Sequence, residues 1–280
     1  MNLSSLPLLM VEPIVRSALL EDLGRAGDLT TDAIVPAAAR AETVLAARQP
    51  GVLAGLDVAA LAFRLVDPAI DVHVERPDGT LVAPGDRIAI VSGPARGMLT
   101  AERVALNFLG HLSGVATATR TLVDAVRGHK ARICCTRKTM PGMRALQKYA
   151  VRAGGGVNHR FGLDDAVLVK DNHVRAAGSI TSAVESLRAA TDLPIEVECD
   201  TLGQVAEALA ADVDTILLDN MTLDELRAAV ALVAGRARLE ASGGVTLESI
   251  RAIAETGVDE ISVGALTHSA RSLDVSLELT

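Results

Sequence analysis

The chain has few cysteines and no long hydrophobic run, and these two shortages exclude several classes of protein. Its 280 residues include three cysteines, Cys134, Cys135 and Cys199. They are too few and too unevenly spaced for a disulfide framework or a zinc site, so we interpret them as small apolar core residues. The apolar runs are short, and none approaches the roughly 20 residues that a membrane-spanning helix needs. We expect a globular protein with a large core.

A secretory signal is also missing. The first residues, MNLSSLPLLMVEP, have neither the basic start nor the small-residue cleavage site of such a segment. We therefore expect a cytoplasmic protein. The formal net charge of -8 predicts that the protein as a whole repels nucleic acid and anionic membranes.

Lysine is absent outside one stretch of the chain. Residues 130–175 hold ten of the 27 Lys and Arg residues but only three acidic ones. All four lysines of the chain lie there: Lys130, Lys138, Lys148 and Lys170. Although a basic stretch is more often just a solvated surface, this concentration indicates a local anion site if the side chains converge.

Short β-rich runs alternate with helical patterns from about residue 130 onward. This order is typical of a parallel sheet with crossover helices. Every strand ends in polar or glycine residues, which favours closure into a barrel over an open doubly wound sheet. The expected strands cover 131–136, 165–170, 195–199, 215–219, 238–243 and 260–265, and the expected helices 202–211, 223–234 and 247–256.

The first 110 or so residues read as a separate α+β domain. A helix is expected over 11–24, and strands are expected over 41–48, 71–76 and 87–93 with turn signals between them. A long helical pattern over 99–126 then leads into the barrel. The fold class is therefore α/β with two domains.

Polar residues of complementary chemistry stand at the carboxyl ends of the expected barrel strands. Parallel barrel strands share one catalytic rim, so these side chains should face one cavity. His159 and Arg160 fall between the first two strands and can join them. The strand-end residues are Thr136, Arg137, Lys138, Lys170, Glu198, Asp219, Ser242, Gly243, Gly244 and Gly264.

Each residue type in this set suits a substrate with several anionic groups. Arginine presents a planar fork to carboxylate or phosphate oxygens, and lysine presents a compact charge. Glycine turns that open helices let backbone N–H groups cradle a phosphate. Carboxylates beside so many cations can hold ribose hydroxyls or a magnesium ion. Each signal is weak alone, and their coincidence carries the functional interpretation.

At these residues the sequence resembles the quinolinate phosphoribosyltransferase family. The resemblance covers nearly the whole chain, and the TRKT-PG and GGG-NHR-GL blocks are its most specific parts. The matching segments are EDLGRAGDLTTD at 21–32, TAERVALNFLGHLSGVAT at 100–117, TRKTMPGMRALQKYAVRAGGGVNHRFGLDD at 136–165, VLVKDNH at 167–173, EVE at 196–198, LLDN at 217–220, EASGGV at 240–245 and VGALTHS at 263–269.

The resemblance implies an N-terminal open-faced α/β sandwich followed by an incomplete α/β (TIM-like) barrel. The expected domains are 1–112, joined by the tail at about 268–280, and 113–267. Family members are homodimers or larger, with active sites shared between subunits. Arg103, in the TAER segment, is then expected to reach the neighbouring subunit's site.

The resemblance also implies a role for each matching residue, with Lys138, Lys170, Glu198 and Asp219 as the catalytic set. Quinolinate contacts fall on Arg137, His159, Arg160 and Lys170, beside Thr136, and pyrophosphate contacts on Lys138 and Lys170. Ribose and Mg²⁺ fall on Glu198 and Asp219. The 5′-phosphate loops match Ser242, Gly243 and Gly244 together with Val263, Gly264 and Ala265.

The implied reaction joins quinolinate to phosphoribosyl pyrophosphate and yields nicotinate mononucleotide, pyrophosphate and carbon dioxide, a step of NAD biosynthesis. Three alternatives remain open at this point. A Schiff-base lyase would use Lys170 as a nucleophile. A paralogous transferase would take another pyridine acceptor, and a catalytically silent sensor would only bind an anionic metabolite.

Overall fold

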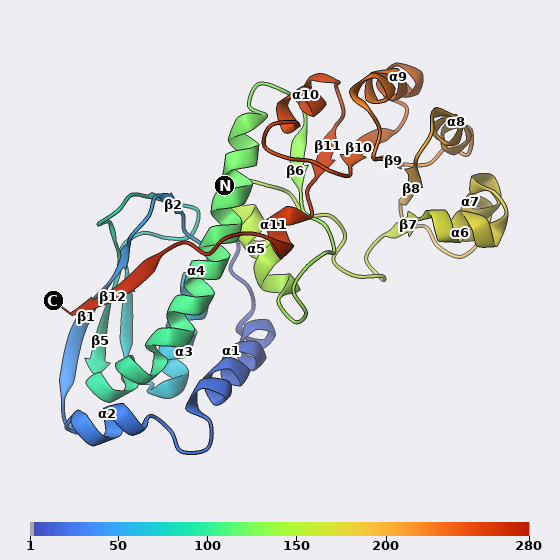
Figure 1. Ribbon diagram of the computed structural model, residues 1–280. Helices are drawn as coiled ribbons and strands as arrows, with labels where there is room; N and C mark the ends of the chain where they lie inside the picture. Colours follow the sequence, from blue (N-terminus) through green and yellow to red (C-terminus); the bar gives the residue numbers. More distant parts are fainter. Residues whose placement is uncertain (1–2, 280) are drawn as a thin grey trace. The chain divides into compact units, whose positions relative to one another are not determined.

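The computed structural model describes residues 3–279, which form two compact units (Figure 1). The first unit comprises the chain up to Arg120, the segment Thr139–Gly155 and the residues from Leu266 onward. The second comprises Thr121–Lys138 and Gly156–Ala265. The boundaries expected from the sequence, 1–112 with the tail from about 268 and 113–267, differ from these units at residues 113–120, 139–155 and 266–267.

The first unit combines helices with an antiparallel sheet. Its helices, wholly or for the most part in this unit, are α1 (Leu8–Leu23), α2 (Leu29–Ile34), α3 (Leu56–Val66), α4 (Ala95–Ala125), α5 (Arg144–Ala153) and α11 (Ala265–His268). Its strands are β1 (Arg40–Ala47), β2 (Gly51–Val52), β3 (Asp71–Val74), β4 (Leu81–Val82), β5 (Arg87–Pro94) and β12 (Val275–Leu279).

The four-stranded sheet of this unit has the order β12-β1-β5-β3, and every neighbouring pair is antiparallel. The resemblance implied a return of the last residues toward the first domain, and β12 pairs with β1, Leu277 opposite Leu45. Helices α3 and α4 lie beside this sheet (Figure 1). Phe63 of α3 and Ile88 of β5 are fully buried in the core.

A buried carboxylate fastens α5 to the start of α3. Asp78 accepts hydrogen bonds from the backbone N–H groups of Gly55 at 2.8 Å and Leu56 at 3.2 Å. It also accepts one from the Tyr149 hydroxyl of α5 at 2.6 Å. Burial raises the pKa of the Asp78 carboxyl above its ordinary value, against the opposing effect of these hydrogen bonds. Asp78 thereby satisfies backbone donors that the helix start leaves without partners.

Close backbone approach explains Gly114 in the middle of α4. A Cβ atom built there would collide with the backbone of Arg271 and Ser272. Leu273, the residue after Ser272, donates its N–H to the carbonyl of Gly110, one helical turn before Gly114, at 2.9 Å. The segment before β12 therefore lies directly against α4, and only glycine fits at the point of contact.

The second unit alternates strands and helices. Its strands are β6 (Arg132–Cys134), β7 (Val167–Val169), β8 (Ile195–Cys199), β9 (Thr215–Asp219), β10 (Arg238–Ser242) and β11 (Glu260–Ser262). Its helices are α6 (Asp171–Ala177), α7 (Ile180–Arg188), α8 (Leu202–Ala210), α9 (Leu223–Val233) and α10 (Ile250–Glu255).

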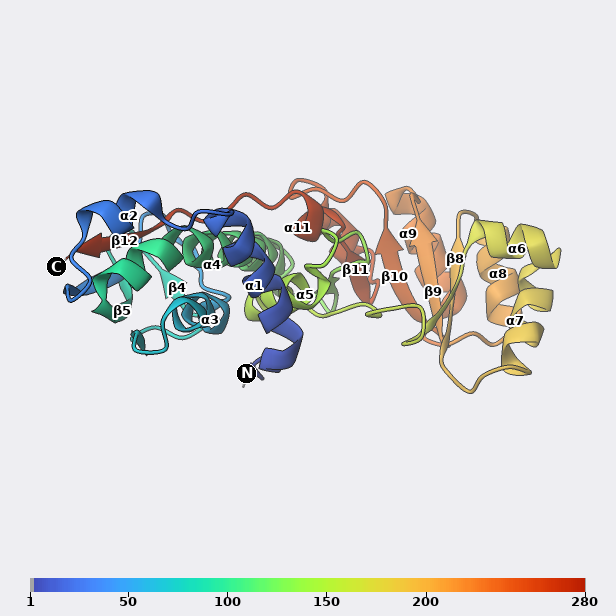
Figure 2. The same cartoon turned by 90° about the horizontal axis from the view of Figure 1, so that it is seen from below.

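All pairings in the sheet of this unit are parallel, in the order β6-β11-β10-β9-β8-β7. Figures 1 and 2 place α7, α8 and α9 along one side of the strands. Ile216 and Leu218, on the helix-covered side of β9, are fully buried. The expected parallel sheet with crossover helices is confirmed.

The sheet does not close. Among the described residues β6 and β7 are its two edges and are not paired with each other. Val157 instead forms an isolated parallel bridge with Cys134 of β6, and the chain then runs through residues 158–166 to β7. The incomplete barrel implied by the resemblance is correct. Full closure, favoured by the polar strand ends alone, is wrong because one loop rather than two more strands fills the gap.

The three cysteines and the helices can be compared with the expectations from composition. Cys134, Cys135 and Cys199 are buried and form no disulfide within residues 3–279, as expected of core residues. Within residues 3–279, no helix combines the length and the apolar character required to cross a membrane. Helices α2, α3, α5, α6 and α7 were not anticipated. Of these, α2 and α6 have only six and seven residues, which is too short for a clear periodic signal.

Gly114→Ala should destabilise the first unit. The added methyl meets backbone rather than a flexible side chain, so α4 or the segment at Arg271 must move, which costs about 1 to 3 kcal/mol. Urea unfolding followed by circular dichroism measures this change. Gly203→Ala is the matched control, since it lies in α8 with its nearest atom 3.8 Å away. Equal stability of the two variants would contradict the proposed close contact.

Candidate active site

The carboxyl ends of the parallel strands gather most of the expected site residues on the second unit. Strand register places Ser242 of β10 directly beside Asp219 of β9. Glu198 of β8 pairs with Leu217 of β9, two residues before Asp219. Because side chains alternate along a strand, Glu198 and Glu196 share one face of β8.

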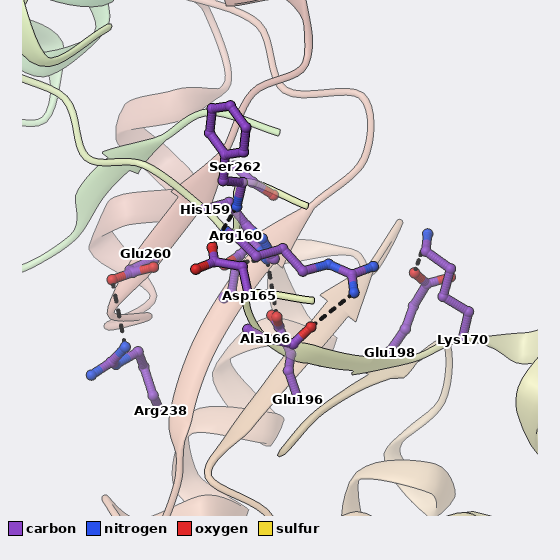
Figure 3. A network of polar contacts seen from close by, with 12 residues as sticks. His159, Arg160, Asp165, Ala166, Lys170, Glu196, Glu198, Arg238, Glu260 and Ser262 are labelled. Atoms are coloured by element: carbon purple, nitrogen blue, oxygen red, sulfur yellow. Dashed lines mark hydrogen bonds and ion pairs between the residues drawn. The ribbon is translucent and has the colours of Figure 1, made fainter. Parts of the chain in front are cut away.

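Lys170 and Glu198 form an ion pair across neighbouring strands. The Lys170 Nζ lies 3.1 Å from the Glu198 Oε2 (Figure 3). The Lys170 backbone N–H donates to His173 Nδ1 at 3.0 Å, which caps the start of α6. The lysine is thus held at the end of β7 by its main chain, while its side chain is 48 % exposed.

Asn220 fixes the carboxylate of Asp219. Its backbone adopts a φ of 54°, a left-handed conformation that asparagine tolerates better than most residues. The Asn220 Nδ2 donates to the Asp219 Oδ2 at 2.7 Å, and its backbone N–H donates to the Ser242 carbonyl at 2.9 Å. Asn220 was not among the residues expected from the sequence, although the tolerance of asparagine for a left-handed conformation after a strand was an available signal.

The glycine turn after β10 is shaped by the same asparagine. Gly243 has a φ of 96°, and a Cβ there would collide with the Asn220 side chain. Gly244 also has a positive φ, 58°, with open space around it. The expectation that this turn opens a helix is wrong, because α10 begins only at Ile250 after the two left-handed residues turn the chain.

The second predicted phosphate loop behaves differently. Val263 donates its N–H to the Cys134 carbonyl at 2.9 Å and is buried. Gly264 follows, and α11 begins directly at Ala265, which is exposed. This short turn therefore does lead straight into a helix.

Two buried arginine donors lack acceptors in this unit. The Nε atoms of Arg137 and Arg160 are inaccessible to solvent and have no hydrogen-bond partner among residues 3–279. The Arg160 Nη1 donates to the Ala166 carbonyl at 3.0 Å (Figure 3). Burial, and next the charge of Arg137, lowers the pKa of the Arg160 guanidinium. Buried donors are rarely left unmatched, so this pair indicates a place for an anionic ligand.

His159 is engaged through both ring nitrogens. Its Nδ1 accepts the backbone N–H of Arg160 at 2.8 Å. Its Nε2 lies 3.0 Å from Glu196 Oε2 and 3.7 Å from Glu240 Oε2. An Nδ1 that accepts a hydrogen bond leaves the proton on Nε2, so the geometry fits a neutral ring that donates toward the carboxylates. The expected contact of His159 with quinolinate thus competes with protein partners on both nitrogens.

Glu196 and Glu240, which the sequence analysis did not select, lie next to a polar cavity of about 300 Å³. Burial, and next the charge of Glu196, raises the pKa of Glu240 to about 7. Glu260 lines the same cavity and pairs with Arg132 and Arg238. No sequence signal could find this pair, because a glutamate within a strand reads as solvent-facing.

The TRKT segment bends sharply after β6. The Lys138 backbone N–H donates to the Thr136 Oγ1 at 3.0 Å, and the Lys138 residue is exposed. In the first unit, the buried Gln147 of α5 accepts the N–H of Met140 at 3.0 Å and donates to the Thr267 carbonyl at 2.7 Å. Gln147 therefore fixes the chain just beyond the motif, a role that the sequence analysis missed.

Arg103 lies apart from these residues along the chain. It belongs to the first unit, on the exposed side of α4. Its flanking residues Ala101 and Val104 are buried against that unit. An exposed arginine on this helix is available to another molecule.

Comparison with known proteins gives consistent results over both units. The protein-family model described as quinolinate phosphoribosyl transferase, N-terminal domain, matches residues 28–113. The family model of the C-terminal domain matches residues 115–278. The chain is 49 % identical over 274 residues to the nicotinate-nucleotide pyrophosphorylase [carboxylating] of Mycobacterium leprae, covering 95 % of each chain. It is 43 % identical to the probable enzyme of that name from Bacillus subtilis, covering 97 % of this chain and 94 % of that one.

A solved structure agrees with these relatives. The nicotinate-nucleotide pyrophosphorylase from Francisella tularensis superposes with a TM-score of 0.95 at 39 % sequence identity. The match covers 100 % of this chain and 99 % of that one. The similarity therefore covers the strands and helices of both units.

Glu240→Gln should change how stability depends on pH. The pKa of Glu240 is about 7 in the folded protein against an ordinary value of 4.5, so the folded state binds the proton more tightly. The free energy of unfolding contributed by Glu240 therefore falls as pH rises from about 4.5 through 7. Glutamine mimics the protonated acid, so the variant should match the wild type at pH 5 and exceed its stability at pH 8, by on the order of 2 kcal/mol.

Urea unfolding at both pH values measures the difference. Glu185→Gln, at an exposed position on α7, is the control and should leave the pH dependence unchanged. A Glu240→Gln variant that is less stable than the wild type at pH 8 would show that the Glu240 carboxylate is charged and favourably paired.

Proposed function

We propose that this chain, which belongs to the quinolinate phosphoribosyltransferase family, transfers a phosphoribosyl group from phosphoribosyl pyrophosphate to quinolinate. The products are nicotinate mononucleotide, pyrophosphate and carbon dioxide, so the enzyme acts in NAD biosynthesis. This activity makes it a pentosyltransferase, and a relative from Nicotiana glauca carries the name quinolinate phosphoribosyltransferase [decarboxylating].

The observation that carries this proposal is the pair of buried arginine donors. Arg137 and Arg160 each keep an Nε–H without an acceptor among residues 3–279, in a region where water does not reach those atoms. A planar acid with two carboxylates supplies acceptors for both guanidinium forks. Quinolinate has this shape, and Lys170 adds a third cation at the end of β7.

Pyrophosphate departure requires positive charge near the leaving oxygens. Lys138 stands beside Arg137 at the end of β6 and is exposed enough to reach a ligand. As the bond to pyrophosphate breaks, the anomeric carbon becomes oxocarbenium-like, and the carboxylates of Glu198 and Asp219 favour that charge. Fixed charges of this kind stabilise the transition state without a covalent intermediate.

Attack by the ring nitrogen of quinolinate then prepares the decarboxylation. The new bond makes the nitrogen quaternary and positive. When carbon dioxide leaves from the adjacent carbon, this positive charge stabilises the electron pair that remains, until a proton replaces the lost carboxyl group. The second carboxylate stays on the product and keeps its pairing with the cationic set of Arg137, Arg160 and Lys170.

A magnesium ion fits the donor chemistry at the ends of β8 and β9. Glu198 and Asp219 offer hard carboxylate oxygens on neighbouring strands. Among the described residues neither belongs to a group of three side chains close enough to ligate one ion. Magnesium in proteins commonly takes one or two carboxylates and completes its shell with substrate phosphates and water. Glu198 and Asp219 would hold it, and it would neutralise pyrophosphate charge.

The remaining predicted contacts belong to the phosphate end of the substrate. Gly243 and Gly244 expose backbone without side-chain bulk, and Ser242 adds a hydroxyl next to Asp219. The turn at Val263–Ala265 leads directly into α11. Both turns suit the 5′-phosphate. Thr136 supports the bend that presents Lys138.

The Schiff-base alternative is disfavoured by the state of Lys170. Its ammonium pairs with Glu198 at 3.1 Å, whereas a Schiff base requires a neutral, unpaired amine. A silent sensor is disfavoured as well, because binding alone does not require carboxylates beside the ribose in addition to the cations.

Substrate choice tests the proposal directly. The enzyme should release pyrophosphate with quinolinate and almost none with nicotinate, because a single carboxylate leaves a buried Nε–H of Arg137 or Arg160 unpaired. An unpaired buried charge costs several kcal/mol, equivalent to about 100-fold or more in catalytic efficiency. The measurement is kcat/KM for the two acids side by side. Comparable values would overturn the proposed specificity.

The proposal includes a cytoplasmic homodimer or larger assembly in which Arg103 completes the partner's site. Its support is the position of Arg103 on the exposed side of α4, in a segment that resembles the family's TAER motif. Isologous pairing would place one Arg103 at each of two equivalent sites.

Mixing two inactive variants tests this shared site. Lys138→Ala and Arg103→Ala should each lose about 100-fold or more in turnover. After subunit exchange, half of the dimers are mixed and one of their two sites carries neither defect, so about a quarter of wild-type activity should return. Copurification of differently tagged subunits verifies exchange. Verified exchange without recovered activity would place Arg103 in its own protomer's site or outside catalysis.

A further inference from the structure

The loop that fills the open side of the incomplete barrel is tied to strands across the sheet. Its first contact is the bridge from Val157 to β6. Two residues later, the His159 side chain contacts Glu196 on β8 and Glu240 on β10. We call these three residues the floor cluster. A single side chain thus connects the loop to strands that are not its neighbours in the sheet order.

The floor cluster is buried inside the second unit rather than lying on its surface. The side chains of His159 and Glu196 are each 12 % exposed, and that of Glu240 is 2 % exposed. A single N–H, on His159 Nε2, lies between the two carboxylates. The Oε1 atoms of both glutamates have no partner among the described residues. Loss of the contact would therefore leave two carboxylates and an imidazole in a poorly hydrated space.

The other nitrogen of the ring acts on the next residue. His159 Nδ1 accepts the backbone N–H of Arg160 at 2.8 Å, so the orientation of the imidazole fixes the direction in which the chain leaves residue 159. Beyond it, Phe161 donates its N–H to Asp165 Oδ2 at 2.6 Å, and the Arg160 side chain donates to the Ala166 carbonyl. Figure 3 shows His159, Arg160 and Glu196 drawn together in this arrangement.

We propose that Glu196 and Glu240 are positioning residues, which hold the His159 ring so that its Nδ1 fixes Arg160 for the acid substrate. This role rests on the proposed function, in which Arg160 binds a carboxylate of quinolinate. The glutamates touch no substrate. They act through the neutral histidine, and the raised pKa of Glu240 agrees with two carboxylates that share a buried space with one N–H donor.

The charges around the cluster favour this role over metal binding. Glu260 of β11 is paired with Arg132 of β6 and Arg238 of β10, which already surround the same cavity with positive charge. Arg137 and Arg160 add two further cations on the side of the predicted substrate. A metal ion on His159 Nε2 would move the proton to Nδ1, where it would oppose the N–H of Arg160.

Kinetics of three variants test the proposal. Glu196→Ala removes the acceptor of the Nε2–H, and Glu196→Gln keeps an acceptor oxygen of the same length without the charge. We expect Ala to raise the KM for quinolinate about 10- to 100-fold, because small misplacement of a binding group has effects of this size. The KM for phosphoribosyl pyrophosphate should stay near its wild-type value. In Glu196→Gln the KM for quinolinate should be close to that of the wild type.

Glu260→Gln is the matched control, since it changes another carboxylate of the same cavity that is paired with arginines instead of His159. It should leave both KM values unchanged. Equal rises of both KM values in Glu196→Ala, or a Gln variant as impaired as Ala, would overturn the positioning role.

Nitrogen NMR of the His159 ring tests the same geometry without any turnover. The wild type should show the neutral Nε2–H form, assigned by its absence in His159→Asn, and Glu196→Gln should preserve it even if the Ala variant fails to fold. An Nδ1–H ring, or a bound divalent metal at one equivalent per chain, would overturn the proposal. If the wild type does not turn over quinolinate but its His159 ring carries the proton on Nε2, the proposed function is wrong while the described hydrogen bonds of the floor cluster are correct.

Discussion

All six strands of the second unit run parallel, and this constraint decides where the chemistry of the protein can occur. A parallel sheet brings every carboxyl end to the same edge, so residues as distant in sequence as Lys138 and Asp219 belong to one rim. The strand interiors then need only to be apolar on the helix-covered side, as Ile216 and Leu218 are. The site depends on this shared edge more than on any single hydrogen bond.

The constraint also explains how much of the protein could be predicted from its sequence. Apolar runs that lead to Lys170, Glu198 or Asp219 predict both a buried strand and a polar residue near its carboxyl end. Strands β7, β8 and β9 were therefore expected within a few residues of their bounds. Closure of the barrel could not be derived in this way. It depends on which strands become edges. β6 and β7 are edges because residues 158–166, which lead into β7, form a loop rather than a strand.

Residues that act by contact across the fold were not predictable either. Gln147 resembles any polar residue on an amphipathic helix until the chain at Met140 folds against it. Glu196 and Glu240 alternate with apolar neighbours, a pattern typical of a solvent-facing strand surface. The inner face of this barrel is instead a buried polar layer, in which carboxylates meet His159 rather than water. Only the folded sheet distinguishes these two environments.

Because β12 pairs with β1, the sheet of the first unit cannot be completed until the end of the chain has been synthesised. In the finished sheet β1 lies between β5 and β12, so one of its two edges is covered by residues made more than 200 positions later. Until then β1 is an open edge with unpaired backbone groups, a known starting point for wrong association. The strands of the second unit, by contrast, are all synthesised before β12 emerges. The sheet of the first unit is therefore completed last, although most of its strands are synthesised first. During synthesis, the open edge of β1 is a site at which the nascent chain can aggregate.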